Sequence, residues 1–304
     1  MKDILQEPQI EWGGVWTEKK LDAFAKYVSA YLKIMKKYPY WKTIYFDGFA
    51  GCGERKDKNK TSIYQGLLLT EKEEKLYKGA AESVLALPDN LSFDYYYFID
   101  SNEKSLNKLK KKLVVYQKSK TNLFQFRSGD CNQWLLELSN AMIRNNNSFA
   151  SLVLLDPFGM QINWESIQSL KHTRTDIWIL IPTGVIVNRL LDKSCELKQS
   201  QKLQSFFGLD KEEIIKYFYE KKTYNSLFGE TEMIRKVSSP IEKIAELYTI
   251  RLKTIWKYVT EKPLRLENSR GVPIFHFVFA SNNPAAVKIA KQIIKSERRW
   301  QPQK

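Results

Sequence analysis

The sequence predicts an α/β fold in which helices cover both faces of a mainly parallel β-sheet. Three observations lead to this prediction. Strand and helix patterns alternate about five times along the first 181 residues, and a glycine-rich turn follows the first strand. The run Leu152-Val-Leu-Leu155 is a short apolar segment of the kind that forms a central parallel strand.

The first helix is predicted at residues 17–38, where apolar residues recur every three or four positions until Pro39. Five strands rich in β-branched and aromatic residues follow, at residues 42–47, 94–100, 122–127, 151–156 and 176–181. Helices are expected between them at residues 80–87, 102–116, 131–144 and 164–170.

The rest of the chain is predicted to add insertions and a closing strand pair to this single domain of residues 1–304. Residues 54–80 are polar in their first part and are expected to form a loop insertion. Residues 185–258 have a helical pattern throughout, with interruptions near Gly208, Gly229 and Pro240, and are expected to be a helical insertion. Residues 264–267 and 274–280 flank Arg270-Gly271 and are expected to pair in antiparallel fashion before a last helix at 284–295.

The charge of the chain points to a polyanionic partner. Its 49 Lys and Arg residues exceed its 34 Asp and Glu residues by 15. Such an excess favours nucleic acid, because neutralising phosphates rewards surface Lys and Arg. Three basic clusters are candidates for contacting a phosphate backbone, although a charge run is usually a solvated face: Arg55, Lys56, Lys58 and Lys60; Lys108, Lys110, Lys111 and Lys112; and Lys291, Lys295, Arg298 and Arg299 before Trp300.

The three cysteines and two histidines argue against a metal centre. Cys52, Cys131 and Cys195 are far apart and form no ligand cluster with histidine. An odd number of cysteines fits a reducing, cytoplasmic location. The N-terminus does not resemble a signal peptide, and no apolar run reaches the ~20 residues of a membrane helix.

The strongest motif is Tyr45-Phe-Asp-Gly-Phe-Ala-Gly-Cys-Gly53. Asp47 ends the first strand, and Gly51 and Gly53 are expected to adopt positive φ and to let the backbone approach a ligand closely. The segment lacks the Lys-Ser/Thr of a P-loop and the full spacing of a dinucleotide-binding turn. A tight strand-to-helix turn without a ligand is the alternative.

Two further acids follow the next strands. Asp100 ends the second strand, where a carboxylate can accept hydrogen bonds from both ribose hydroxyls. Asp130 follows the third strand in Ser128-Gly-Asp-Cys131. Each acid can instead be the N-cap of the helix that comes next.

The fourth motif, Leu154-Leu-Asp-Pro-Phe-Gly159, lies at the carboxyl end of a buried strand, where open α/β sheets bind their ligands. Asp156, Pro157 and Phe158 are therefore candidates for contacting a substrate. The alternative is a loop that packs Phe158 into the core.

These four motifs, in this order, resemble those of class I S-adenosylmethionine (SAM)-dependent methyltransferases. The resemblance implies a Rossmann-like sheet of parallel strands closed by a C-terminal antiparallel strand. It also implies that Asp47, Phe49, Ala50, Gly51 and Gly53 hold the methionine part of SAM, Asp100 the ribose and Asp130 the adenine. Asp156-Pro-Phe158 is similar to the Asp-Pro-Pro-Tyr/Phe motif that orients a target amine, but its aromatic residue comes one position early and its second proline is missing.

Nearly the whole chain also resembles the three-Cys-motif partner protein (TcmP) family. The resemblance includes Trp16-Thr-Glu-Lys-Lys-Leu-Asp22, Leu155-Asp-Pro-Phe-Gly-Met160, Trp178-Ile-Leu-Ile-Pro182 and Ala280-Ser-Asn-Asn-Pro284. It implies a three-Cys-motif, radical-SAM-like protein as a partner. Two functions are therefore weighed: a methyltransferase acting on nucleic acid, at a base amino group, and a non-catalytic nucleic-acid-binding partner subunit. A nuclease would require a carboxylate metal cluster, for which the sequence offers no convincing candidate.

Two isolated residues complete the sequence predictions. His276 alternates within an apolar strand and is expected to be a hydrogen-bonded core residue. Arg270, beside a glycine in a turn, is a candidate for contacting a substrate or for forming a salt bridge.

Overall fold

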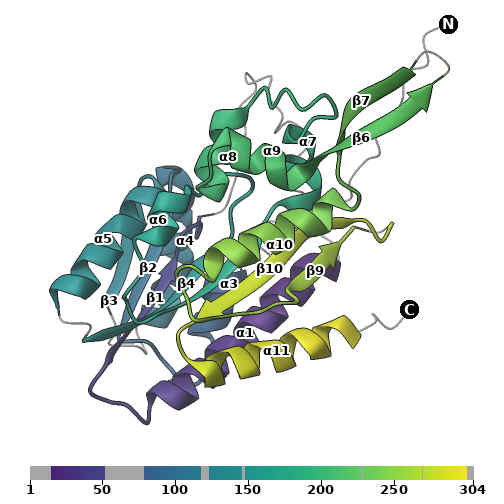
Figure 1. Ribbon diagram of the computed structural model, residues 1–304. Helices are drawn as coiled ribbons and strands as arrows, with labels where there is room; N and C mark the ends of the chain where they lie inside the picture. The colour runs from purple at the N-terminus through teal and green to yellow at the C-terminus, as the bar shows by residue number, and fades with distance from the viewer. Residues whose placement is uncertain are drawn as a thin grey trace, which may run out of the picture.

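A computed structural model describes residues 15–51, 79–117, 123–145, 148–226, 229–268 and 270–299 (Figure 1). The predicted site residue Gly53, most of the predicted 54–80 loop and Trp300 lie outside these residues. The elements in chain order are α1 (Val15–Met35), β1 (Lys42–Asp47), α3 (Gly79–Leu85), β2 (Tyr95–Asp100), α4 (Glu103–Gln117), β3 (Leu123–Ser128), α5 (Cys131–Arg144), β4 (Phe149–Leu155), α6 (Trp164–Gln168), β5 (Thr175–Ile181), the π-helix η1 (Thr183–Val187), α7 (Asn188–Leu190), α8 (Ser200–Phe207), α9 (Lys211–Phe218), β6 (Tyr219–Ser226), β7 (Gly229–Lys236), α10 (Pro240–Leu252), β8 (Tyr258–Val259), β9 (Leu264–Glu267), β10 (Pro273–Ser281) and α11 (Pro284–Arg299).

Eight of these strands form one sheet in the order β3-β2-β1-β4-β5-β10-β8, with β9 paired to β10 beside β8. The first five are parallel, and β10 is antiparallel to β5, with Phe277 opposite Leu180. The strand order reverses direction between β1 and β4, which lie side by side. The predicted antiparallel closing strand is therefore confirmed, and the sheet has the Rossmann-like order of class I methyltransferases.

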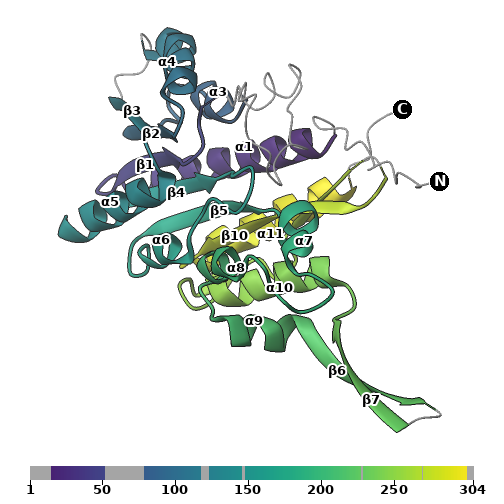
Figure 2. The same ribbon diagram turned by 90° about the horizontal axis from the view of Figure 1, so that it is seen from above.

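Helices cover both faces of the sheet (Figure 2). Helices α1, α3, α4 and α11 pack on one face, and α5, α6, α8, α9 and α10 pack on the other. Alternation along β1 divides the two cores, because Tyr45 points to the first layer and Ile44 and Phe46 to the second. Residues of β4 and β5 are buried on both faces, which explains their continuous apolar sequences.

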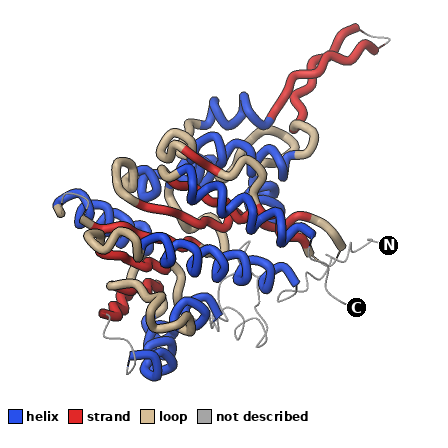
Figure 3. The backbone as a smooth tube through the Cα atoms, turned by 90° about the horizontal axis from the view of Figure 1, so that it is seen from below, coloured by secondary structure: helices blue, strands red, loops and turns tan. Residues whose placement is uncertain are grey.

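The segment between β5 and β10 departs from the helical prediction for residues 185–258. It contains η1 and helices α7 to α10, but Tyr219–Ser226 and Gly229–Lys236 pair as the β6–β7 hairpin. The hairpin extends away from the body of the domain (Figures 1 and 3). Tyr219 at the base of the hairpin is buried in the core, but residues 220–223 and 232–235 are exposed, so these parts lack the apolar–polar alternation that identifies a half-buried strand.

The predicted interruptions have local causes. Gly208 ends α8 with φ +63°, and Pro240 occupies the first turn of α10. Gly229 instead begins β7.

Candidate functional site

The acids predicted at strand ends meet at the carboxyl edge of the sheet. β2, β1 and β4 are adjacent, and they end at Asp100, Asp47 and Leu155, directly before Asp156. The negative charges of Asp156 and Asp100 both act on Asp47 and raise its pKa. Register in the sheet therefore brings together three carboxylates that are far apart in sequence.

Asp47 is almost completely buried, with 3% of its surface exposed. Its Oδ2 accepts a hydrogen bond from the Tyr45 hydroxyl at 3.0 Å, and its Oδ1 accepts one from the Phe49 backbone N–H at 3.2 Å. Burial raises the pKa of Asp47 to about 7, against the lowering effect of these two hydrogen bonds. At neutral pH this carboxyl group is therefore poised between its two protonation states.

Gly51 lies directly against Asp100, which explains the need for glycine. The Asp100 Oδ2 accepts a hydrogen bond from the Gly51 N–H at 3.1 Å, and a Cβ at position 51 would be 2.5 Å from the Asp100 Cγ. The expected positive φ is wrong for Gly51: among the described glycines only Gly129, Gly208 and Gly271 have one. Close approach of a side chain, and not a left-handed backbone, excludes a larger residue here.

Asp100 is fixed on both sides by backbone donors. Its Oδ1 accepts a hydrogen bond from the Asn102 N–H at 2.6 Å, in addition to the Gly51 contact at Oδ2. Burial raises the pKa of Asp100. Both carboxylate oxygens retain further acceptor capacity for a ligand hydroxyl.

Asp130 is the N-cap of α5. This is the alternative that the sequence offers beside a role in binding adenine. Its Oδ1 accepts hydrogen bonds from the backbone N–H and the side-chain amide of Asn132, both at 2.9 Å. The preceding Gly129 has φ +137°, which turns the chain from β3 into the helix. Asp130 is also solvent-exposed, so capping does not prevent it from contacting a ligand.

A cavity of about 210 Å³ opens between the loops that follow β1, β2 and β3. Two predicted site residues, Phe49 and Asp130, line it, together with Gly48, Ser101, Gly129, Cys131 and Gln161. Asp47, Gly51 and Asp100 support its walls through the contacts described above. Ala50 is instead buried in the core, with its N–H donating to the Ile99 carbonyl at 2.8 Å.

Gln161 was not predicted from the sequence. Its Oε1 accepts a hydrogen bond from the Phe158 N–H at 2.9 Å, and its carbonyl accepts one from the Asn132 side-chain amide at 2.8 Å. Gln161 thereby ties the Asp-Pro-Phe-Gly loop to the start of α5. The sequence signal that could have identified it is its position five residues after Asp156, at the end of the same loop.

Asp156 forms a buried ion pair with Lys20 of α1. The Lys20 Nζ lies 2.5 Å from the Asp156 Oδ2, and the two side chains are only 4% and 7% exposed. The pair joins two of the segments that carry the TcmP resemblance, across 136 residues. Pro157 beside it is buried and Phe158 is partly buried.

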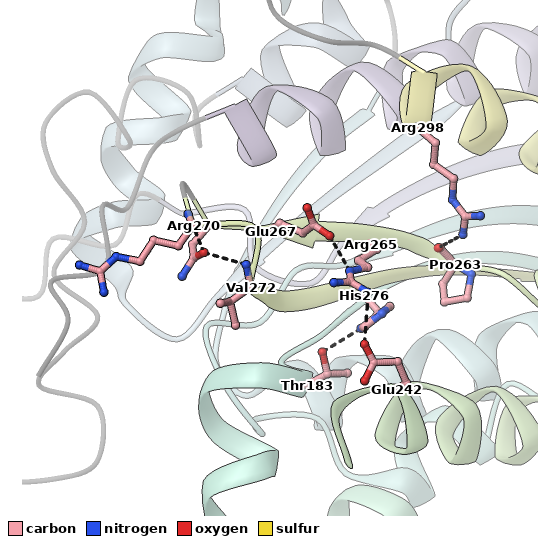
Figure 4. A network of polar contacts seen from close by, with 10 residues as sticks. Thr183, Glu242, Pro263, Arg265, Glu267, Arg270, Val272, His276 and Arg298 are labelled. Carbon is pink, nitrogen blue, oxygen red and sulfur yellow. Dashed lines mark hydrogen bonds and ion pairs between the residues drawn. The ribbon is translucent and has the colours of Figure 1, made fainter. Parts of the chain in front are cut away.

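His276 and Arg270 were singled out in the sequence, and they have different environments (Figure 4). The buried His276 ring is hydrogen-bonded through Nδ1 to the Thr183 hydroxyl at 2.8 Å, which confirms the core prediction. Burial, with the charges of Arg265 and Arg298, lowers the pKa of His276 to about 4. The Arg270 N–H donates to the Asn268 side chain in the turn before β10.

The arrangement at the carboxyl edge suits a ligand that carries a positive charge beside hydroxyl groups. Buried carboxylates attract a cation strongly where little water is present to screen them. The described residues contain no group of three or more His, Cys, Asp or Glu side chains placed to hold a metal ion. Among the same residues, no helix combines the length and apolar character needed to cross a membrane.

No family model matches the chain, and no curated protein matches it. Among solved structures, protein LPL1258 from Legionella pneumophila, a DUF519 protein, shares 12% identity over 87% of this chain and 97% of its own, with a TM-score of 0.35. Trm1 from Pyrococcus horikoshii, in complex with S-adenosyl-L-methionine, shares 9% identity over 93% of this chain and 76% of its own, with a TM-score of 0.35. The sheet order, with its antiparallel closing strand β10, gives the chain a Rossmann-like, methyltransferase-like fold.

Proposed function

We propose that this protein is a SAM-dependent methyltransferase that acts on nucleic acid, at an amino group of a base. The observation that carries the proposal is the cavity at the carboxyl edge, bounded by the loops after β1, β2 and β3 and lined by Phe49 and Asp130. In open α/β sheets this edge, where the strand order reverses, is the place where nucleotide-like ligands bind.

The charges of the described residues support SAM as the ligand. Asp47 and Asp100 would favour its sulfonium and ammonium groups, and Asp100 would also accept its ribose hydroxyls. Gly51, which has no room for a Cβ, keeps the loop close to Asp100. Phe49 and Ala50 belong to the same loop. Gly53, which the methyltransferase resemblance assigns to the methionine part of SAM, lies outside the described residues.

The acceptor side of the site would be formed by Asp156, Pro157 and Phe158. Bound SAM would supply an electrophilic methyl group, and the protein would mainly hold the acceptor nitrogen in line with it, since alignment accounts for much of the rate of such a transfer. Asp156 would accept a hydrogen bond from the amine, and Phe158 would contact the base.

A polynucleotide as substrate is supported by charge. The net charge is +15, and five lysines of α4 are exposed, Lys104, Lys108, Lys110, Lys111 and Lys112. This supports a phosphate contact without distinguishing DNA from RNA.

Isothermal titration with SAM tests the cofactor assignment. We expect binding by the wild type and a loss of at least about tenfold in affinity for Asp100→Asn. Asp210→Asn is the matched control, because Asp210 caps α9 away from the cavity. If the wild type gives no heat and no thermal shift with SAM, the proposal is wrong.

Transfer of tritium from labelled SAM to total cellular DNA, RNA and protein then identifies the substrate class. Label should enter nucleic acid with the wild type and not with Asp156→Ala.

The Lys20–Asp156 pair favours a second function. Lys20 already occupies one oxygen of the carboxylate that is expected to orient the acceptor, and both side chains are buried. The chain would then be a non-catalytic, nucleic-acid-binding partner subunit of a three-Cys-motif, radical-SAM-like protein. Under this alternative the paired replacement of Lys20→Met with Asp156→Leu, which leaves no buried charge, keeps the activity of the complex intact, whereas under the first function it abolishes methyl transfer.

A further inference from the structure

A second cavity lies at the opposite, amino edge of the sheet. It has a volume of about 230 Å³ and is lined by the start of β4 and of β5, the end of β10, and side chains of α1 and α11. The strands between the two cavities have six or seven residues, so the cavities are roughly 20 Å apart. The proposed methyl transfer uses none of the residues of this second cavity.

Two opposite charges face this cavity from the start of β5. Asp176 lies in β5, Arg174 directly precedes this strand, and both residues line the cavity. Asp176 is partly buried and accepts hydrogen bonds from the Tyr27 hydroxyl, at 2.6 Å, and from Ser281. The Arg174 guanidinium stacks on Trp41, with its Cζ 3.8 Å from the ring centroid.

Tyr31 supplies an unused polar group between these charges. Its hydroxyl oxygen is buried, has no hydrogen-bond partner among the described residues, and lies close enough to feel the charges of both Asp176 and Arg174. A buried hydroxyl without a partner is unfavourable, and few are found in native proteins. The Tyr31 hydroxyl is therefore a position at which a ligand can supply the missing hydrogen bond.

The other wall of the cavity is apolar. Ile34 and Met35 line it from α1, and Ala286 and Ile289 line it from α11. A ligand that fits must therefore carry a cationic nitrogen, an anionic oxygen and an apolar group within about 230 Å³.

We propose that this cavity binds an apolar α-amino acid, with its ammonium group at Asp176, its carboxylate at Arg174 and Tyr31, and its side chain against α1 and α11. The pairing follows from charge: a simple amine would be repelled by Arg174, and a simple carboxylic acid by Asp176. The carboxylate completes the hydrogen bonding of the Tyr31 hydroxyl.

Titration calorimetry with the full-length protein and L-leucine or L-phenylalanine tests the proposal. The matched probes are isoamylamine and phenethylamine, which lack the carboxylate, and 4-methylpentanoate and 3-phenylpropionate, which lack the amine. We expect at least one amino acid to bind and each of its two matched probes to bind about tenfold more weakly or not at all.

Variants separate a specific site from weak surface binding. Asp176→Asn keeps the shape of the site and removes its charge, and should weaken amino-acid binding about tenfold or more. Tyr31→Phe removes only the hydroxyl, and should weaken binding a few-fold without lowering the thermal midpoint of the free protein. SAM affinity, measured in parallel, should be the same in both variants as in the wild type.

The result does not depend on the proposed methyl transfer. Absence of amino-acid binding, or equal binding of the amine-only probes, overturns this inference even if SAM binds. Conversely, a protein that binds L-leucine and not SAM supports this inference and contradicts the proposed function.

Discussion

The two edges of the sheet each hold an acid with a raised pKa, Asp47 at the carboxyl edge and Asp176 at the amino edge, but the sets of donors differ. At the carboxyl edge, a backbone N–H donates to each acid: Phe49 to Asp47, Gly51 to Asp100 and Asn132 to Asp130, and the neighbouring Tyr45 hydroxyl also donates to Asp47. At the amino edge, side-chain hydroxyls of Tyr27 and Ser281 donate to Asp176.

The difference shows which kind of site is encoded locally. The Phe49–Asp47 and Asn132–Asp130 contacts each span two residues, and the Gly51–Asp100 contact joins the ends of two adjacent strands, whereas the Tyr27–Asp176 contact spans 149 residues. The Lys20–Asp156 pair is the exception at the carboxyl edge, because there a distant side chain holds the acid.

Breaking the Lys20–Asp156 ion pair should have the largest effect on stability of the changes considered at the two edges. Lys20→Met leaves the Asp156 carboxylate buried without its cation and should lower the free energy of unfolding by about 3–5 kcal/mol. Urea denaturation measures the change. The control is Lys33→Met on the same helix, because the Lys33 side chain is exposed and the expected loss is below about 1 kcal/mol.

A double variant shows whether the loss comes from the unpaired charge. Replacing both partners, as in Lys20→Met with Asp156→Leu, should restore much of the lost free energy, because no buried charge remains. If Lys20→Met alone unfolds no more easily than Lys33→Met, the pair has no structural role.

The two raised acids predict a dependence of stability on pH. Burial raises the pKa of Asp47 to about 7, so between pH 4 and 7 the folded state holds a proton that the unfolded state has released. Stability should therefore fall as pH rises, by about 2–3 kcal/mol from pH 5 to 8 for this group. Unfolding free energies of the wild type and Asp47→Asn across this range measure the effect, and the variant should lose most of the slope.

The acid at the amino edge should contribute a smaller slope of the same sign. Burial raises the pKa of Asp176 only to about 6. The fall in stability that Asp176 causes with rising pH is therefore complete about one pH unit below that of Asp47. Asp176→Asn should remove this smaller part, and an unchanged slope in both variants would mean that neither acid is protonated in the folded state.

Gly51 tests whether the carboxyl edge depends on close packing. A Cβ in Gly51→Ala would be 2.5 Å from the Asp100 Cγ, so Asp100 must move. We expect a loss of about 1–3 kcal/mol in stability, and SAM binding at least tenfold weaker. Gly79→Ala is the control, because its Cβ would meet only the flexible Leu21 side chain, at 3.2 Å. Equal behaviour of the two variants would argue that Asp100 is not held by Gly51.

The distinction between local patterns and contacts of distant segments explains how much could be predicted from the sequence. The strands were predictable because β4 and β5 are apolar on both faces, and the acids at the ends of β1, β2 and β4 mark the carboxyl edge. The β6–β7 hairpin was not, because Lys and Glu occupy both of its faces.

Contacts between distant segments could not be predicted from the sequence either. Nothing near Lys20 in sequence indicates Asp156, and nothing near Tyr31 indicates Arg174 and Asp176. Gln161 has ordinary neighbours, and its role appears only when its loop meets α5. These contacts depend on how the helices pack on the sheet, which local sequence patterns do not encode.

The smallest expected effect separates the two roles of Asp130. Asp130→Ala removes the N-cap of α5 and should cost about 1 kcal/mol, which is also expected for Asp210→Ala at the N-cap of α9. Asp130 lines the cavity and Asp210 does not, so only Asp130→Ala should also weaken SAM binding. Thermal unfolding and calorimetry on the two variants measure both effects. If Asp130→Ala loses stability and keeps full SAM affinity, Asp130 is a helix cap alone, and the adenine must be recognised by other residues of the cavity.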